Sequence, residues 1–139
     1  MTDRQKLVDL LIEHEGCVLT AYTDTVGKIT IGVGRNLTDV GISHAEAVLL
    51  LDHDLDAVLE DCLTFAWFPP LDPVRQRAVC DLRFNVGATG FRMFRHFIAA
   101  MARKDYQQAS LELQDSRWAA QVQRSRVNRL RSMIETGEE

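Results

Sequence analysis

Long apolar runs are absent from this 139-residue sequence, and their absence excludes a membrane-spanning helix. Residues Met1 to Lys6 are polar, so we also find no secretory signal. The sequence has no excess of positive charge, and a formal net charge of -4 argues against non-specific nucleic-acid binding. We therefore expect one folded, cytoplasmically made domain without a nucleic-acid partner or stable membrane association.

Cysteine and histidine are too few and too scattered to indicate a metal site or a disulfide framework. The three cysteines are an odd number without C-x-x-C spacing, and the four histidines form no H-E-x-x-H pattern. We expect Cys17, Cys62 and Cys80 to be small buried thiols rather than disulfide partners. We also expect no metal ion and no cofactor.

Helical periodicity extends over most of the chain. The capping patterns T-x-x-Q at Thr2 and S-x-x-E at Ser43 predict two helix starts, and Asp72-Pro73 predicts a third. We expect helices over residues 2–15, 43–62, 72–86, 91–102, 106–113, 116–121 and 123–134. The phenylalanines of the fourth helix are at core spacing, which favours packing over a row for stacking sugars, and residues 136–139 are expected to fray.

The segment from Glu13 to Arg35 predicts a helix that stops at Gly16, followed by a short β-hairpin that turns at Gly27. Residues 28–33 alternate between polar and apolar side chains. This alternation predicts that Ile29, Ile31 and Val33 face the core and that Thr30 lies on the other face. Residues 36–41 are expected to form a polar loop.

Three polar side chains of this segment, Glu15, Asp24 and Thr30, could converge on one open surface. Glu15 follows Leu11 and precedes Cys17 and Val18, and these apolar neighbours favour its neutral form, whereas Asp24 lies in a polar turn that favours ionisation. Two carboxyl groups in different surroundings are what hydrolysis of a glycosidic bond requires. A solvated helix end and a turn aspartate are the structural alternative.

This segment resembles the active-site segment of the phage-type lysozymes, the endolysin muramidases. The matching positions are Glu15, Gly16, Tyr22, Asp24, Thr25, Gly27, Thr30, Ile31, Gly32 and Gly34. The resemblance continues through F-N-V-G-A-T-G at 84–90, S-R-W at 116–118 and R-x-x-R…T-G at 126–137. It implies an α+β, predominantly α-helical, lysozyme-like two-lobed domain over residues 1–139. The small hairpin lobe is expected at about 15–45 and a linking helix at about 43–62. The helical lobe is expected at about 63–139, together with the N-terminal helix.

The same resemblance implies hydrolysis, with inversion, of the β-1,4 bonds between N-acetylmuramic acid and N-acetylglucosamine in bacterial peptidoglycan. Glu15 is then the general acid, and Asp24 and Thr30 hold the attacking water. The residues implied to bind substrate are Phe84, Asn85, Asn36 and Arg126, the last of them near the catalytic glutamate. A monomer would act on the cell wall or in the periplasm during host lysis, after release by a separate route such as a holin.

Other functions remain open from the sequence. A catalytically weak peptidoglycan-binding or regulatory protein could keep the same fold, and a chitin-oligosaccharide hydrolase is a closer enzymatic alternative. Residues 40–51 could also pass for a DNA-binding helix-turn-helix. A recognition helix should present basic or amide side chains to the groove, whereas residues 48–56 offer leucines and aspartates.

Overall fold

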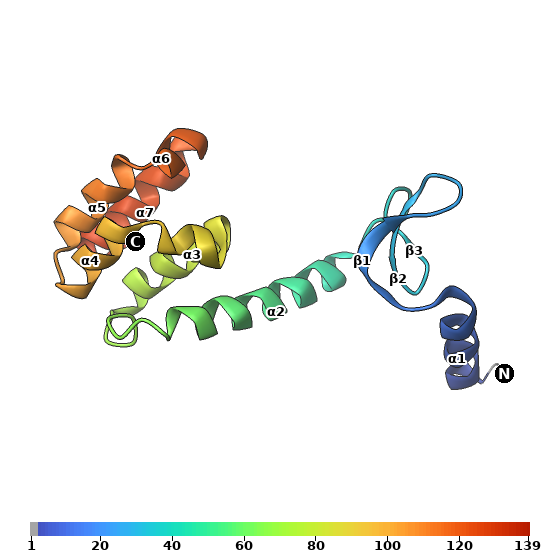
Figure 1. The fold of residues 1–139 in the computed structure, drawn as a ribbon. Helices are drawn as coiled ribbons and strands as arrows, with labels where there is room; N and C mark the ends of the chain where they lie inside the picture. Colours follow the sequence, from blue (N-terminus) through green and yellow to red (C-terminus); the bar gives the residue numbers. More distant parts are fainter. Residues whose placement is uncertain (1–2) are drawn as a thin grey trace. The chain divides into compact units, whose positions relative to one another are not determined.

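The computed structural model describes residues 3–139 and confirms an α+β fold that is predominantly helical. The chain divides into two compact units, residues 1–50 and 51–139. The helices are α1 Arg4–Glu15, α2 His44–Cys62, α3 Pro73–Arg92, α4 Arg95–Ala102, α5 Tyr106–Gln114, α6 Arg117–Gln121 and α7 Arg124–Thr136 (Figure 1). The strands are β1 Val18–Thr23, β2 Ile29–Gly32 and β3 Arg35–Asn36.

Helix α1 begins slightly later than the capping pattern at Thr2 predicts. Asp3 is the N-cap, and its carboxylate accepts a hydrogen bond from the backbone N–H of Lys6 at 3.1 Å. The predicted cap at Thr2 lies outside the described residues. The predicted end is confirmed, because Gly16 adopts a positive φ of 74° and its N–H donates to the carbonyl of Ile12.

The predicted hairpin is part of a three-stranded antiparallel sheet in the order β1-β2-β3. Gly27 has the expected positive φ, 86°, in the turn between β1 and β2. The third strand ends within the segment predicted to be a loop. Thr30 is paired with Asn36 and Ile31 with Arg35, across a turn formed by Val33 and Gly34.

The prediction of which side chains of β2 are buried is wrong. Thr30 is only 4% exposed, whereas Ile29 is 50% exposed and Val33 39%. Thr30 is opposite Tyr22 on β1 and Asn36 on β3, and directly opposed residues project from the same face of a sheet. The central position between two flanking side chains therefore encloses the threonine. Alternation identified the two faces correctly, but not which of them is covered.

Helix α2 begins with the predicted capping box. Glu46 N–H donates to Ser43 Oγ at 3.1 Å, and Ser43 N–H donates to Glu46 Oε1 at 2.9 Å. Arg35 also binds Glu46, with Nη1 and Oε1 3.0 Å apart. The backbone N–H of Ser43 and this guanidinium lower the pKa of Glu46 to about 2. The start of α2 is thereby connected to strand β3.

In the second unit, α3 starts as predicted, with Asp72 accepting from the N–H of Arg75 and with Pro73 in the first turn. Gly87 has non-helical angles (φ 79°, ψ 171°) and breaks the helix where the sequence predicts a stop. A helical segment continues to Arg92, so the predicted helix from Phe91 to Ala102 is wrong in its first part. Phe91 belongs to α3, and α4 starts after Phe94.

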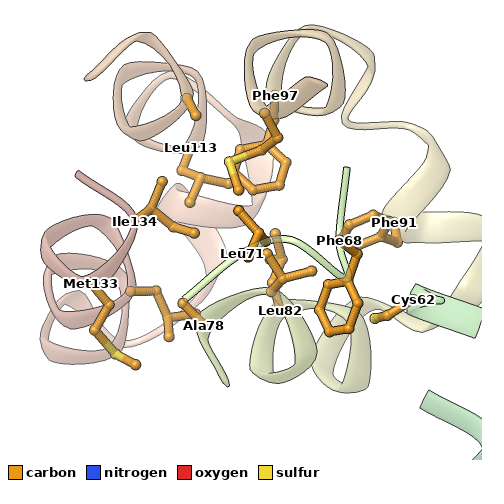
Figure 2. Close-up of a cluster of buried hydrophobic side chains, with 14 of the residues drawn as sticks. Cys62, Phe68, Leu71, Ala78, Leu82, Phe91, Phe97, Leu113, Met133 and Ile134 are labelled. Atoms are coloured by element: carbon orange, nitrogen blue, oxygen red, sulfur yellow. The ribbon is translucent and has the colours of Figure 1, made fainter. Parts of the chain in front are cut away.

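The core of the second unit is a cluster of buried side chains from α2 to α7 (Figure 2). Phe91 and Phe97 are 0% and 1% exposed, and their rings meet edge to face at 6.3 Å, which confirms the predicted packing role of this aromatic row. Cys62 is buried and Cys80 partly buried, both as free thiols. Cys17 is exposed just before β1, so its predicted burial is wrong.

The last turn of α7 is fixed by an arginine of α3. Arg75 donates to the carbonyls of Ile134 and Glu135 at 2.7 and 2.9 Å, which satisfies two acceptors that a helix end leaves open. Gly137 then ends α7 in the left-handed conformation. The expected fraying of residues 136–139 does not describe this structure, because the Glu139 carboxylate binds Arg77 at 2.7 Å.

Candidate functional site

Glu15 is positioned by the end of α1 and by the turn between β2 and β3. Its carboxylate lies directly over Gly34, where a Cβ atom would be only 2.9 Å from Glu15 Oε2. Gly34 also has a φ of 64°, which disfavours any residue with a side chain. The glycine therefore does two things: it forms the tight turn, and it leaves the space that the carboxylate occupies.

The apolar neighbours that were expected to shelter Glu15 do not do so within this unit. Glu15 is exposed, as are Leu11 at 45% and Val18 at 38%. The reason is local: the chain turns sharply at Gly16, so Cys17 and Val18 continue as extended chain instead of covering the helix end. The carboxylate lies against the turn at Gly34, and the expected apolar shelter is absent among the residues of this unit that the structure describes.

Asp24 is fixed by the backbone of the turn between β1 and β2. Its Oδ1 accepts hydrogen bonds from the N–H groups of Val26 and Lys28 at 3.0 and 2.8 Å. Within residues 3–139 no protein group donates to its other oxygen, Oδ2. One oxygen of the carboxylate thus determines the orientation of the side chain, and the second is available to accept a hydrogen bond from water or a ligand.

Thr30 is connected to Asp24 through the main chain of Lys28. The Lys28 carbonyl accepts from the Thr30 hydroxyl at 3.2 Å and from the Asp24 N–H at 2.8 Å, while the Lys28 N–H donates to the Asp24 carboxylate. Because the hydroxyl proton is directed to this carbonyl, Thr30 Oγ1 can accept a further hydrogen bond. Sequence reasoning missed Lys28, since its contribution comes from backbone atoms; only its position in the turn after Asp24 was a signal.

The Asn36 side chain forms hydrogen bonds within its own loop. Its side-chain amide donates to Asp39 Oδ2 and accepts from the Asp39 N–H, both at 3.0 Å. Asp39 also pairs with the Lys28 ammonium group at 3.1 Å. These bonds close the loop after β3 and tie it to the turn that carries Asp24. The role of Asn36 in substrate binding stays a prediction.

Phe84 and Asn85 lie in the second unit, on α3 just before the break at Gly87. Phe84 is 44% exposed. Asn85 Oδ1 accepts from the indole N–H of Trp118 at 2.7 Å, which joins α3 to α6. Trp118 in turn lines a hollow of about 540 Å³ between the end of α3 and helices α4 to α6. Two segments that resemble phage-type lysozymes, 84–90 and 116–118, therefore meet at one hydrogen bond.

Arg126 is paired with Asp81 of α3. Its Nε and Nη2 atoms donate to Asp81 Oδ1 at 2.9 and 2.7 Å. The sequence offered no signal for this partner, which lies 45 positions earlier. The pair fixes the guanidinium against α3, and the predicted role of Arg126 near the catalytic glutamate stays a prediction.

The catalytic candidates of the first unit thus lie around one small sheet. Glu15, at the end of α1, lies against the β2–β3 turn at Gly34, and Asp24, in the β1–β2 turn, is joined to Thr30 of β2 through Lys28. A small antiparallel sheet in a mainly helical α+β chain is consistent with the fold of the lysozyme class. The chain belongs to the phage lysozyme family, since the family profile described as "Phage lysozyme" matches residues 12–132. Family membership makes it a muramidase-type lysozyme and implies peptidoglycan as the substrate.

Individual relatives agree with this assignment. The chain is 28% identical to "Probable T4-type lysozyme 2" of Dictyostelium discoideum, over 94% of each sequence. It is 26% identical to "Pre-baseplate central spike protein Gp5" of Enterobacteria phage T4, over 94% of this chain and 28% of that protein. It is also 36% identical to "SAR-endolysin" of Escherichia phage Mu, over 58% of this chain and 48% of that protein. No helix among residues 3–139 is both long and apolar enough to cross a membrane.

Proposed function

We propose that the protein hydrolyses the β-1,4 bond between N-acetylmuramic acid and N-acetylglucosamine in peptidoglycan, with inversion at the anomeric carbon. The observation that carries this proposal is the arrangement around Lys28. It leaves one Asp24 oxygen without a protein donor and directs the hydroxyl proton of Thr30, whose side chain is 4% exposed, to the Lys28 carbonyl, so that each residue retains an oxygen that can accept a hydrogen bond. Acceptors of this kind bind both protons of a water molecule and leave its lone pair free to attack.

Glu15 is the proposed general acid, which donates its proton to the glycosidic oxygen as the bond breaks. A bound saccharide would displace water from this exposed carboxyl group and bring the glycosidic oxygen to its proton. Contact with the turn at Gly34 holds the carboxyl in one place before substrate arrives, which reduces the entropy lost in reaching the reactive geometry.

Asp24 and Thr30 are proposed to hold the attacking water on the opposite face of the sugar. An inverting pair of carboxyl groups requires a separation of roughly 6.5–9.5 Å, which leaves room for that water. As the water attacks, Asp24 takes its proton, and Glu15 loses one to the leaving sugar. Because the water approaches opposite the leaving oxygen, the product has the inverted configuration.

We further propose that Phe84, Asn85, Asn36 and Arg126 bind the saccharide. Phe84 offers an exposed ring for stacking, and Asn85 is held by Trp118, so that its amide nitrogen has a defined direction. Arg126 is oriented by Asp81 and offers its remaining N–H groups to substrate. Asn36 would contribute by fixing the loop beside the Asp24 turn.

The experiment compares the wild type with Glu15→Gln on purified peptidoglycan. Product analysis should give muramic acid reducing ends in the α configuration for the wild type, and Glu15→Gln should be slower by about 10²- to 10⁴-fold, the range for loss of a general acid. Glu13→Gln, two positions earlier on α1, is the matched control and should retain activity. Equal product formation by the wild type and Glu15→Gln would remove Glu15 from the mechanism.

A second candidate function is a catalytically weak peptidoglycan-binding or regulatory protein, favoured by the acidic net charge of -4 on a protein whose substrate is itself acidic. Binding to peptidoglycan without release of reducing ends would support it. For the cellular role, we propose that a monomer made in the cytoplasm reaches the wall through a separate release system and contributes to host lysis. Lysis timing in cells with and without a co-expressed holin tests this role.

A further inference from the structure

The peptide group between Lys28 and Ile29 holds two of the catalytic candidates on one of its sides. Its carbonyl oxygen, that of Lys28, accepts from the Asp24 N–H at 2.8 Å and from the Thr30 hydroxyl at 3.2 Å. Its N–H, that of Ile29, lies on the other side of the same planar unit, because a trans peptide directs its C=O and N–H oppositely. A group that binds this N–H therefore also affects the direction of the carbonyl.

The acceptor of the Ile29 N–H is a side chain of the loop after β3. Thr38 Oγ1 accepts this N–H at 2.8 Å, and the Leu37 N–H donates to the Ile29 carbonyl at 2.7 Å. Ile29 and Leu37 lie one step beyond the pairs of β2 with β3, where a regular antiparallel ladder would direct the Ile29 N–H to the Leu37 carbonyl. The Thr38 hydroxyl takes the place of that carbonyl and so adds a last rung to the sheet.

Thr38 is held in place by the residues on either side of it. Asn36 and Asp39 exchange two hydrogen bonds, both at 3.0 Å, and the Val40 N–H donates to the Asn36 carbonyl at 3.1 Å. The Asp39 carboxylate also lies 3.1 Å from the ammonium group of Lys28. Thr38 is exposed, but these bonds close its loop against the start of β2. Its hydroxyl therefore offers the peptide group a fixed acceptor, where water would offer a mobile one.

We propose that Thr38 is a positioning residue, which holds the Lys28–Ile29 peptide group and, through it, the Thr30 hydroxyl and the turn of Asp24. The proposal rests on the proposed function for the role of Asp24 and Thr30 in holding the attacking water. Without the Thr38 hydroxyl, the peptide group can turn about its flanking single bonds, and its carbonyl then no longer fixes both donors. Thr38 acts through this peptide group and takes no part in the bond changes.

Three variants separate this role from a merely structural one. Thr38→Val keeps nearly the same shape and loses the acceptor oxygen, whereas Thr38→Ser retains it. Thr20→Val is the matched control, because it makes the same chemical change at an exposed threonine of β1 whose hydroxyl has no hydrogen-bond partner among residues 3–139. All three are compared with the wild type on soluble peptidoglycan fragments, at a temperature where urea unfolding shows each protein to be fully folded.

Thr38→Val should lower kcat by about three- to tenfold, the contribution of one hydrogen bond, and should change KM by less than about twofold. The held water is needed in the transition state, so poorer positioning lowers kcat and leaves saccharide binding unchanged. Thr38→Ser should recover most of the rate, and Thr20→Val should match the wild type. Equal kcat in the wild type and Thr38→Val, or an equal loss in Thr38→Val and Thr38→Ser, would overturn the proposal.

Amide hydrogen exchange, followed by NMR in the absence of substrate, tests the same coupling without turnover. Loss of the acceptor frees the Ile29 N–H in any case, so the informative proton is the Asp24 N–H, which binds the opposite side of the peptide group. Its exchange should be about three- to tenfold faster in Thr38→Val and unchanged in Thr38→Ser and Thr20→Val. Faster exchange at Ile29 alone contradicts the proposal, because Thr38 would then serve only the end of the sheet.

Failure of the proposed function gives a different pattern of results. If the wild type releases no reducing ends from peptidoglycan while Asp24 exchange responds to Thr38→Val, the peptide group is held as proposed and the chemistry assigned to Asp24 and Thr30 is wrong. If the wild type is active and neither kcat nor Asp24 exchange responds, the role assigned to Thr38 is wrong and the proposed function stands.

Discussion

At the scale of single residues, the catalytic candidates are positioned by backbone atoms that take no part in the proposed reaction. Glu15 is held against a glycine, and Asp24 and Thr30 are joined through the main chain of Lys28. The side chains proposed to perform the reaction are thus positioned by backbone geometry. A substitution that alters this geometry should reduce activity even when Glu15, Asp24 and Thr30 are all retained.

Gly34→Ala tests this dependence. The added Cβ would meet Glu15 Oε2 at 2.9 Å, so the carboxylate must move, and a displacement of this size should lower the rate of peptidoglycan hydrolysis by about 10²-fold. Because the backbone has a φ of 64°, the alanine should also lower the free energy of unfolding by roughly 1–2 kcal/mol. Hydrolysis rates and urea unfolding should be measured together.

Gly41→Ala is the matched control for that substitution. Gly41 has nearly the same angle, φ 67°, but nothing lies within 4 Å of the point that an added Cβ would occupy. It should lose a similar amount of stability and keep its hydrolytic rate. If both variants lose activity equally, strain rather than displacement of Glu15 explains the effect, and the role assigned to Gly34 is wrong.

At the scale of secondary-structure elements, α2 is joined to α3 by a partly buried cluster of charges. Asp61, near the end of α2, accepts from Arg83 at Oδ2 and from Arg92 at both oxygens, at 2.6 Å for Oδ1 and 3.1 Å for Oδ2. The carboxylate is only 17% exposed. The guanidinium of Arg92, together with that of Arg83, lowers the pKa of Asp61 from 3.8 to about 2. Arg83 directly precedes Phe84, so this cluster also fixes the segment predicted to bind saccharide.

Asp61→Asn should therefore destabilise the protein in a pH-dependent way. Because the folded-state pKa is lower than the unfolded one, the carboxylate stabilises the fold fully above pH 4, and this contribution is lost as the pH falls toward 2. We expect a loss of about 2 kcal/mol at pH 7 that shrinks steadily below pH 4.

Urea unfolding of both proteins between pH 7 and pH 2.5 checks this expectation. Asp56→Asn, an exposed aspartate of the same helix, is the control and should follow the wild type at every pH. A difference between Asp61→Asn and the wild type that stays constant down to pH 2.5 would contradict the electrostatic explanation. In that case lost packing, rather than lost charge, would account for the destabilisation.

At the scale of the whole molecule, the second unit has a continuous buried core and the first unit does not. Phe91, Phe97 and Leu82 are at most 1% exposed, whereas no residue of α1 is buried. The first unit relies instead on its sheet, on the capping box of α2 and on tight turns. Large losses of stability should therefore follow from core substitutions in the second unit.

Phe97→Ala should lower the unfolding free energy by about 3–5 kcal/mol, because it removes a fully buried ring that packs against Phe91 and Phe94. Met93→Ala, at a side chain that is 71% exposed, should change it by less than about 0.5 kcal/mol. Denaturant unfolding followed by tryptophan fluorescence measures both, since Trp118 lies beside Phe94. Similar values for the two variants would contradict the assigned core.

Part of this fold could be predicted from local sequence, and the errors arose where competing local signals or neighbouring strands decided the outcome. Asp72-Pro73 and the Ser43–Glu46 pair act within one helical turn and were predicted correctly. Asp3 was passed over because Thr2 offers a capping pattern one residue earlier. The facing of Thr30 was missed because an alternating strand has two faces, and only the flanking strands decide which one is enclosed.

The sequence by itself determined where the helices α1 and α3 break, at Gly16 and Gly87, and which three residues of the first unit carry the proposed chemistry. These properties depend on backbone angles and on residue types close together in the chain. Only the tertiary structure decided that Glu15 lies against Gly34, that Arg126 binds Asp81, and that Glu139 lies between Arg77 and Arg129. Such contacts join residues far apart in sequence, and they form only when packing brings their elements together.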